Sequence, residues 1–218
     1  MAGTITALKA LRRDRARVAV FLDGEESFSL ALIHALWLKV GQTLSDNEID
    51  ALRASDTLEK ARQRVIGLLE YRPRTVQEVR QRLARAGVDE ATSGKVIDEL
   101  REAGLLDDRA FADAWVESRL RANPRGKRML AWELRRKGAA PDAVSAALSG
   151  IDDSVAALAA ARKRLPRLDG LEARERRQKL IEHLARNGFS YTIIEDVLAK
   201  LALADEGPPD EGKDEAWT

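Results

Sequence analysis

The sequence predicts a mainly α-helical fold, in which three tandem three-helix repeats follow a small N-terminal module of a β-hairpin and short helices. Glycines that close a helix pattern recur at Gly87, Gly138 and Gly188, at intervals of 51 and 50 residues. Pro73 and Pro124 are also 51 residues apart. Helix-ending and helix-breaking residues that recur at a constant interval indicate an internal repeat. Aromatic residues make up only 5% of the chain, so the cores depend on Leu, Ala, Val and Ile, a composition that favours helices.

The N-terminal segment has the pattern of a β-hairpin. Apolar side chains alternate over residues 18–22 and are followed by the turn signal Asp23-Gly24. Because a hairpin alone is only marginally stable in water, a third strand is expected, and residues 4–11 can supply it. Two short helices are predicted next, over residues 31–38 and 46–54.

From residue 55 onward, each repeat shows the same order of helix signals. An Asp or Ser N-cap opens the first helix, a break precedes the second, and a glycine in a left-handed C-terminal cap ends the second helix. Asp56 is predicted to cap the first of these helices, and the pairs Asp107-Asp108 and Asp152-Asp153 are assigned the same role in preference to catalysis. The predicted helices span residues 57–71, 76–86 and 89–103 in the first repeat, 109–121, 127–137 and 141–148 in the second, and 154–165, 171–187 and 190–201 in the third.

Charge is unevenly distributed along the 218 residues. The net charge is +1, but residues 201–218 carry −5 and residues 1–200 therefore carry +6. A basic body with an acidic tail is typical of proteins that bind a polyanion or an acidic partner. The tail is predicted to be disordered and to compete for the basic surface. The predicted division of the chain is residues 1–54 for the N-terminal module, 55–106, 107–151 and 152–203 for the repeats, and 204–218 for the tail.

The composition argues against several classes of site. The chain contains no cysteine, which excludes disulfides and thiolate metal sites. His34 and His183 lie in different modules without a partner at metal-ligand spacing. Nucleotide-binding, nucleophile-elbow and zinc-protease motifs are absent from the sequence, so we expect no catalysis, no cofactor and no metal. Residues 28–40, the most apolar segment, are too few to span a membrane and no secretory signal is recognisable, so we expect a soluble, cytoplasmic monomer.

Basic residues form the one positive functional signal. Residues 61–138 contain eighteen Lys and Arg against twelve Asp and Glu, and the excess gathers near the second helices. A charge run is usually a solvated helix face, but its recurrence favours a surface that binds phosphates or carboxylates. Tyr71, Trp115 and Trp132 are assigned to cores in preference to base stacking. The candidate binding residues are Arg72, Arg74, Arg80, Arg82, Arg85, Arg121, Arg125, Lys127, Arg128, Arg135, Arg136 and Lys137.

The second repeat resembles a known family. The runs GLLDDRAFADAWVESR, NPRGK and ELRRKG, at residues 104–119, 123–127 and 133–138, resemble the RecX regulators of the bacterial RecA recombinase. The run RPRTVQEVRQRL at residues 72–83 fits the first repeat of that family. The resemblance covers roughly residues 55–200, and the third repeat departs from it where LPRLDG, at residues 165–170, replaces the NPRG turn.

This resemblance implies a chain of three-helix units in an elongated, curved array. It also implies binding in the groove of the RecA filament on single-stranded DNA, with limits on filament extension, ATP hydrolysis and strand exchange. Some members of the family assist RecA instead, so the sign of regulation stays open, as does direct contact with single- or double-stranded DNA. DNA repair, homologous recombination and the SOS response are the processes that the resemblance implies.

Other classes of function remain open at this point. A helical nucleic-acid-binding protein or transcription regulator that acts without RecA is one alternative, because helix–short loop–helix segments suit duplex readout. A scaffold that binds only proteins is another. Preference for a defined duplex sequence distinguishes the first alternative, and binding that survives charge reversal of Arg135 and Arg136 distinguishes the second.

Overall fold

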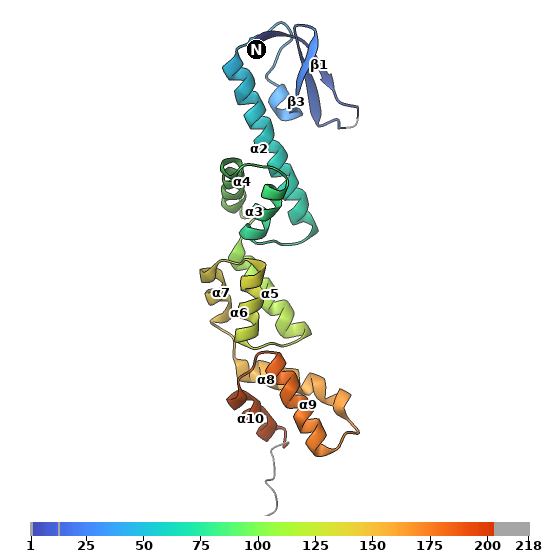
Figure 1. The fold of residues 1–218 in the computed structure, drawn as a ribbon, viewed down its shortest axis with the longest axis vertical. Helices are drawn as coiled ribbons and strands as arrows, with labels where there is room; N and C mark the ends of the chain where they lie inside the picture. The colour runs from blue at the N-terminus through green and yellow to red at the C-terminus, as the bar shows by residue number, and fades with distance from the viewer. Residues whose placement is uncertain (1, 13, 203–218) are drawn as a thin grey trace, which may run out of the picture. The chain divides into compact units, whose positions relative to one another are not determined.

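The computed structural model describes residues 2–12 and 14–202, and the chain divides into two compact units, Met1–Asp107 and Asp108–Thr218. The first unit holds the N-terminal module and the first helical repeat, and the second unit holds the other two repeats (Figure 1). The predicted acidic tail, residues 204–218, lies outside the described residues.

The N-terminal module is a four-stranded antiparallel sheet in the order β3-β2-β1-β4. The Asp23-Gly24 turn has positive φ at both residues, as a two-residue hairpin requires, and the predicted third strand is confirmed as β1. The helix predicted over residues 31–38 is shorter than expected. The elements are β1 (Gly3–Ala10), β2 (Arg17–Leu22), β3 (Glu25–Ala31), α1 (Leu32–Ala35) and β4 (Thr43–Leu44).

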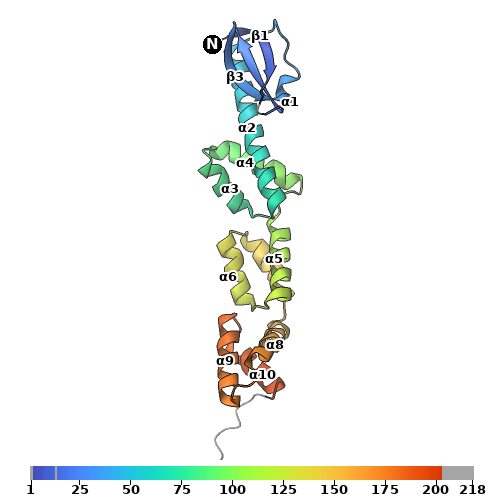
Figure 2. The ribbon, with the colours of Figure 1, turned by 90° about the vertical axis from the view of Figure 1, so that its right-hand side faces the viewer.

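The prediction of separate helices over residues 46–54 and 57–71 is wrong, because a single helix, α2 (Asp46–Tyr71), runs through both. Ser45 and Glu48 form a capping box at its start. The helix packs against β3 near its N-terminal end and against α3 and α4 of the first repeat further on (Figure 2). The sheet module and the first repeat therefore share one helix.

Asp56 is the reason that the expected break does not occur. It does not cap a helix but lies in the middle of α2, with only 3% of its surface exposed. Its carboxylate accepts hydrogen bonds from the Arg17 guanidinium and the Ala31 backbone N–H, both at 2.8 Å, and pairs with Lys60. Burial alone would raise the pKa of Asp56, but these donors outweigh burial and leave it lowered.

The predicted three-helix repeats are confirmed. The first repeat packs α2 with α3 (Val76–Arg85) and α4 (Glu90–Glu102), which Thr75 and Asp89 cap. Its core is aliphatic, and full burial of each such side chain contributes about 1.5–3 kcal/mol. The fully buried members of that core include Val65, Val79, Leu83, Val96 and Ile97.

The second unit contains two further repeats, each with its own core. Gly87, Gly138 and Gly188 all have φ between 77° and 89°, which confirms the predicted left-handed caps. The second repeat consists of α5 (Asp108–Ala122), α6 (Lys127–Lys137) and α7 (Pro141–Leu148). The third consists of α8 (Asp153–Arg164), the short 3-10 helix η1 (Leu165–Leu168), α9 (Ala173–Arg186) and α10 (Tyr191–Lys200).

The Asp pairs have more varied roles than the predicted capping. Asp152 does cap α8, where its carboxylate accepts the backbone N–H groups of Ser154 and Val155. Asp108 accepts the N–H of Ala140 at 2.9 Å, and Asp153 accepts the N–H of Lys127 at 2.8 Å. These two carboxylates therefore tie the start of one helix to the start of another.

No single helix within the described ranges has the length and apolar character to span a membrane; α7 and α8 with η1 meet those criteria only as a pair bent by 74°.

Candidate functional site

The structure separates the twelve predicted binding residues into groups, and the first group is anchored. Arg74 is buried and donates to the Leu68 carbonyl at 3.0 Å and to the Glu78 carboxylate. Arg72 binds the same carboxylate with two nitrogens, at 2.6 and 3.0 Å. Although burial would raise the pKa of Glu78, the hydrogen bonds and charge of Arg72 and the charge of Arg74 leave it lowered. Both arginines hold the turn between α2 and α3.

A second group forms ion pairs on the surface. Arg80 pairs with Glu90 at 3.1 Å, and Arg121 pairs with Glu117 one helical turn earlier on α5. Exposed pairs of this kind contribute between zero and about 1 kcal/mol, so an incoming phosphate can compete with them.

The remaining predicted residues are exposed or half-buried. In the first repeat, Arg82 and Arg85 are exposed on α3. In the second repeat the exposed cations lie on α6, at Arg128, Arg135, Arg136 and Lys137. Arg82, Arg85, Arg128, Arg135 and Arg136 make no ion pair within residues 2–12 and 14–202. These side chains are the ones that remain available to a ligand.

One face of α6 combines cations with an exposed tryptophan. Arg128, Trp132 and Arg136 follow one another at intervals of four residues, which places them in a row along the helix. The assignment of Trp132 to a core is wrong, because 53% of its surface is exposed. Tyr71, which is 84% exposed, is not a core residue either, whereas Trp115 is half-buried and packs against the core of the second repeat.

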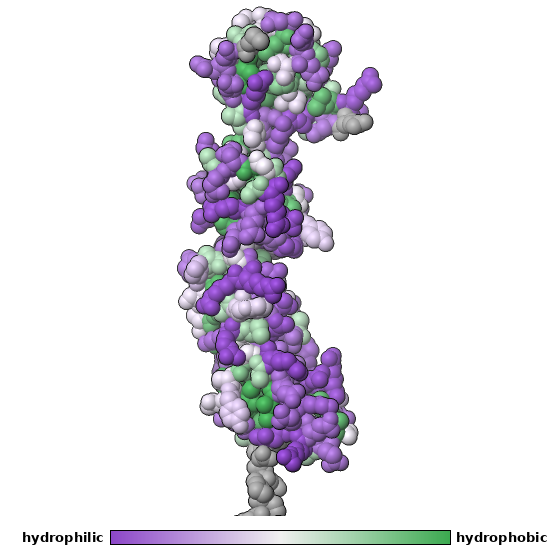
Figure 3. All heavy atoms as spheres, viewed as in Figure 1, coloured by the Kyte–Doolittle hydropathy of each residue, from purple (hydrophilic) through white to green (hydrophobic). Residues whose placement is uncertain are grey.

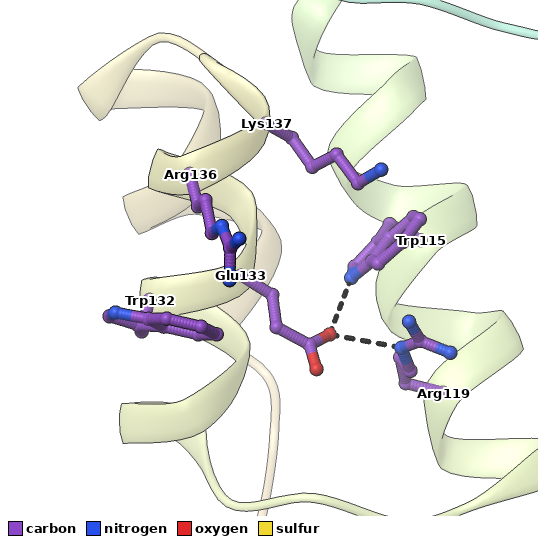
Figure 4. A pocket seen from close by; sticks show the side chains of 6 residues that line it. All are labelled: Trp115, Arg119, Trp132, Glu133, Arg136 and Lys137. Carbon is purple, nitrogen blue, oxygen red and sulfur yellow. Dashed lines mark hydrogen bonds and ion pairs between the residues drawn. The ribbon is translucent and has the colours of Figure 1, made fainter.

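Glu133 organises the contact between α5 and α6. Only 6% of its surface is exposed, and one of its oxygens accepts the Trp115 indole N–H at 2.8 Å and the Arg119 guanidinium at 2.9 Å (Figure 4). Its other oxygen pairs with Arg125. Burial and the charge of Arg119 lower the pKa of Arg125. Glu133 therefore lies between two guanidinium groups and offsets the repulsion between them.

Cation–π contacts extend this network to the surface. Arg119 lies 4.3 Å from the centroid of the Trp115 ring and Lys137 lies 5.0 Å from it. Arg136 lies 5.2 Å from the centroid of the Trp132 ring. A cation at such a distance is attracted to the ring face. Between the two tryptophans is an open cavity of about 360 Å³, lined by Trp115, Arg119, Trp132, Glu133, Arg136 and Lys137 (Figure 4).

The NPRGK turn faces the third repeat. The N–H of Gly126 donates to the Asn187 carbonyl at 3.0 Å, and a Cβ on Gly126 would lie 2.7 Å from the Gly188 oxygen. The Lys127 backbone is held by Asp153, and its side chain is half-buried. The turn, which carries the predicted binding residues Arg125 and Lys127, thus joins the two repeats of the second unit.

Sequence reasoning overlooked Glu133 and placed Trp132 in the wrong environment. A signal for each was present in the spacing. Glu133 lies three residues after Leu130, on the apolar side of α6, which points to burial. Trp132 lies four residues from a basic residue on either side, which places it on the charged face. No group of three or more His, Asp or Glu side chains in the described part of the chain is arranged to hold a metal ion.

The space-filling view shows hydrophilic residues over much of the visible face of the helical repeats (Figure 3). Fold and surface together define a tandem three-helix-repeat protein with a sheet module at its N-terminus and a basic, tryptophan-bearing helix face in its second repeat. Models of the first, second and third three-helix domains of RecX match residues 61–100, 107–148 and 152–198. The chain belongs to the RecX family.

Curated relatives and solved structures agree with this assignment. The regulatory protein RecX of Clostridium botulinum strain Alaska E43 is 32% identical over 201 residues, which are 89% of this chain and 94% of the relative. That of Prosthecochloris aestuarii is 40% identical over 147 residues, 67% of this chain and 96% of the relative. A crystal structure of a regulatory protein RecX covers 90% of this chain and 99% of its own, with a TM-score of 0.71 and 26% identity. The RecX structure from Lactobacillus salivarius shares the fold, with a TM-score of 0.61.

Proposed function

We propose that this protein modulates the RecA recombinase, as a negative regulator that binds in the groove of the RecA filament on single-stranded DNA. In this role it limits filament extension, ATP hydrolysis and strand exchange. Membership of a family whose curated relatives are named regulatory proteins supports the proposal. The structural observation that carries it is the group of exposed cations on α6, namely Arg128, Arg135, Arg136 and Lys137.

The charges of this group suit a nucleoprotein ligand. Arg128, Arg135 and Arg136 are exposed and make no ion pair within the described ranges. A guanidinium binds phosphate or carboxylate with paired hydrogen bonds, and a group of such cations attracts a negatively charged filament over several ångströms. In the first repeat, Arg82 and Arg85 offer the same chemistry on α3.

The proposed role is regulatory and not enzymatic. We place the protein in the cytoplasm, as a monomer that acts on the RecA nucleoprotein filament in DNA repair, homologous recombination and the SOS response. Binding of single- or double-stranded DNA without RecA is part of the proposal for the α6 face.

The test is the DNA-dependent ATPase of RecA from the same organism, measured with increasing amounts of this protein at low salt. We expect the ATPase rate to fall at substoichiometric to equimolar amounts. The charge reversal Arg135→Glu with Arg136→Glu should raise the concentration needed for half of the effect by at least about tenfold, a loss of about 1.4 kcal/mol.

The matched control is Arg101→Glu, which reverses an exposed charge on α4 outside the predicted binding set and should leave the effect unchanged. Absence of any effect on ATPase, together with no detectable binding to the filament, would overturn the proposal. Preference for a defined duplex sequence over RecA-coated DNA would instead identify a nucleic-acid-binding regulator that acts without RecA.

A further inference from the structure

Trp132 presents an exposed indole on the surface of the second repeat. Its neighbours Leu130 and Leu134 are buried in the core of the second repeat, whereas 53% of the Trp132 surface faces solvent. An exposed indole offers a large, flat apolar surface that a planar ligand can cover.

Cations frame this indole on both sides along the helix. Arg128 precedes it by four residues and Arg136 follows it by four, and the Arg136 guanidinium lies over the ring at 5.2 Å from its centroid (Figure 4). Alternation of an aromatic ring with cations is how proteins hold single-stranded nucleic acid, because rings stack on bases while cations contact the phosphates between them.

We propose that Trp132 is a stacking platform for a base of single-stranded DNA, with Arg128 and Arg136 as the contacts to its neighbouring phosphates. This inference rests on the proposed function, in which the ligand is a filament on single-stranded DNA, and specifies which residue touches the DNA itself. The ligand is single-stranded because the faces of paired bases are covered by their neighbours in a duplex.

The surroundings of Trp132 favour a nucleic acid over an acidic peptide. A peptide carboxylate needs only the cations and makes no use of the exposed indole. The adjacent cavity has room for part of a base beside the ring. The Glu133 carboxylate, which lines this cavity, is already bound by Trp115, Arg119 and Arg125. A base can therefore lie against Trp132 without meeting an unpaired negative charge from Glu133.

The test compares two labelled strands of equal length, an oligothymidylate and an abasic strand with the same phosphates, by fluorescence anisotropy in the absence of RecA. The full-length protein should bind the strand with bases more tightly. Trp132→Leu should weaken binding to that strand by roughly 5- to 150-fold and leave binding to the abasic strand almost unchanged. Trp132→Phe keeps an aromatic face and should retain most of the difference.

Arg128→Gln provides the matched contrast, since loss of a phosphate contact should weaken binding to both strands by the same factor. Far-ultraviolet circular dichroism checks that each variant folds. Equal binding of the two strands by the unmodified protein, or binding of neither, overturns the inference, as does a Trp132→Leu variant that still distinguishes them. Because RecA is absent from this assay, failure of the stacking inference can be distinguished from failure of the proposed function, which is tested by the RecA ATPase.

Discussion

The backbone N–H of Gly126 donates a hydrogen bond of 3.0 Å to the carbonyl oxygen of Asn187. This bond joins the second repeat to the third at a point where the two backbones touch, and a side chain on either Gly126 or Gly188 would collide with the other repeat. The bond explains the glycine of the NPRGK turn without reference to a ligand. It also suggests how the two repeats are kept as one compact unit.

We predict that Gly126→Ala lowers the free energy of unfolding by about 1–3 kcal/mol, because its Cβ would lie 2.7 Å from the Gly188 oxygen. Urea denaturation provides the measurement. Gly67→Ala is the matched control, since Gly67 lies inside α2 with nothing within 4 Å of the added Cβ, and this change should stabilise the protein by about 0.5–1 kcal/mol. Equal effects of the two changes would contradict the role of the close contact.

Glu133→Gln should destabilise the second repeat. The change removes the charge that Arg119 and Arg125 share, and a buried ion pair that loses one partner typically costs about 3–5 kcal/mol. We expect about 1–3 kcal/mol here, because both arginines retain some contact with water. Glu117→Gln, which breaks an exposed pair with Arg121, should change stability by less than about 0.5 kcal/mol in the same denaturation experiment.

Asp56→Ala should loosen the sheet module from α2. The change leaves the Ala31 N–H and the Arg17 guanidinium without the acceptor they share, and an unsatisfied buried donor costs about 1–3 kcal/mol. Hydrogen exchange should show faster exchange of the Ala31 amide. Asp50→Ala, an exposed change on the same helix, should leave that amide protected.

Stability should fall as the pH is lowered through the titration of His183. Burial and the charges of Arg164, Arg186 and Arg167 lower the pKa of His183 below its usual value of 6.5. The unfolded chain therefore takes up a proton first, and stability is lost from near pH 6.5 down to the lowered native pKa. The Asn187 amide group lies 3.0 Å from the neutral Nε2, a contact that protonation would break.

His183→Gln should reduce this pH dependence, as measured by thermal unfolding at several pH values. A slope in the same pH window that is identical in the variant would assign the dependence to another group.

Arg135→Gln should reduce the salt dependence of binding to single-stranded DNA. Each phosphate contact contributes a slope of about −0.7 to the logarithm of affinity against the logarithm of salt concentration. Loss of one contact should make the slope shallower by about 0.7 and weaken binding to all sequences by the same factor. Arg101→Gln on α4 is the control, and a slope that does not change with Arg135 would remove this residue from the interface.

The repeats could be predicted because their signals are local. The glycine caps at Gly87, Gly138 and Gly188 and the helix starts at Ser45, Asp89 and Ser190 depend on residues within a turn of each position. Asp56 shows where this reasoning fails. An aspartate before TLEKA has the appearance of an N-cap, but its partners Arg17 and Ala31 come from the sheet, and the tertiary contact outweighs the local preference.

The surroundings of the candidate binding residues were predictable only in part. The sequence gives the number of cations but not their partners. Glu78 holds Arg72 and Arg74, and Glu133 holds Arg125, in pairs that form only when the chain folds. The sequence does place the excess of basic residues near the second helices, and the exposed cations lie on the second helices α3 and α6.

The length of α2 has a geometric consequence. The 26 residues of this helix span about 39 Å, and each residue advances the helix by about 100°. One residue more or fewer between Asp56 and the first repeat would rotate the sheet by more than a quarter of a circle about the helix axis. Within the first unit, the number of residues in α2 thus fixes the orientation of the sheet relative to the first repeat. A single insertion or deletion would rotate the sheet about the helix axis and leave both modules intact.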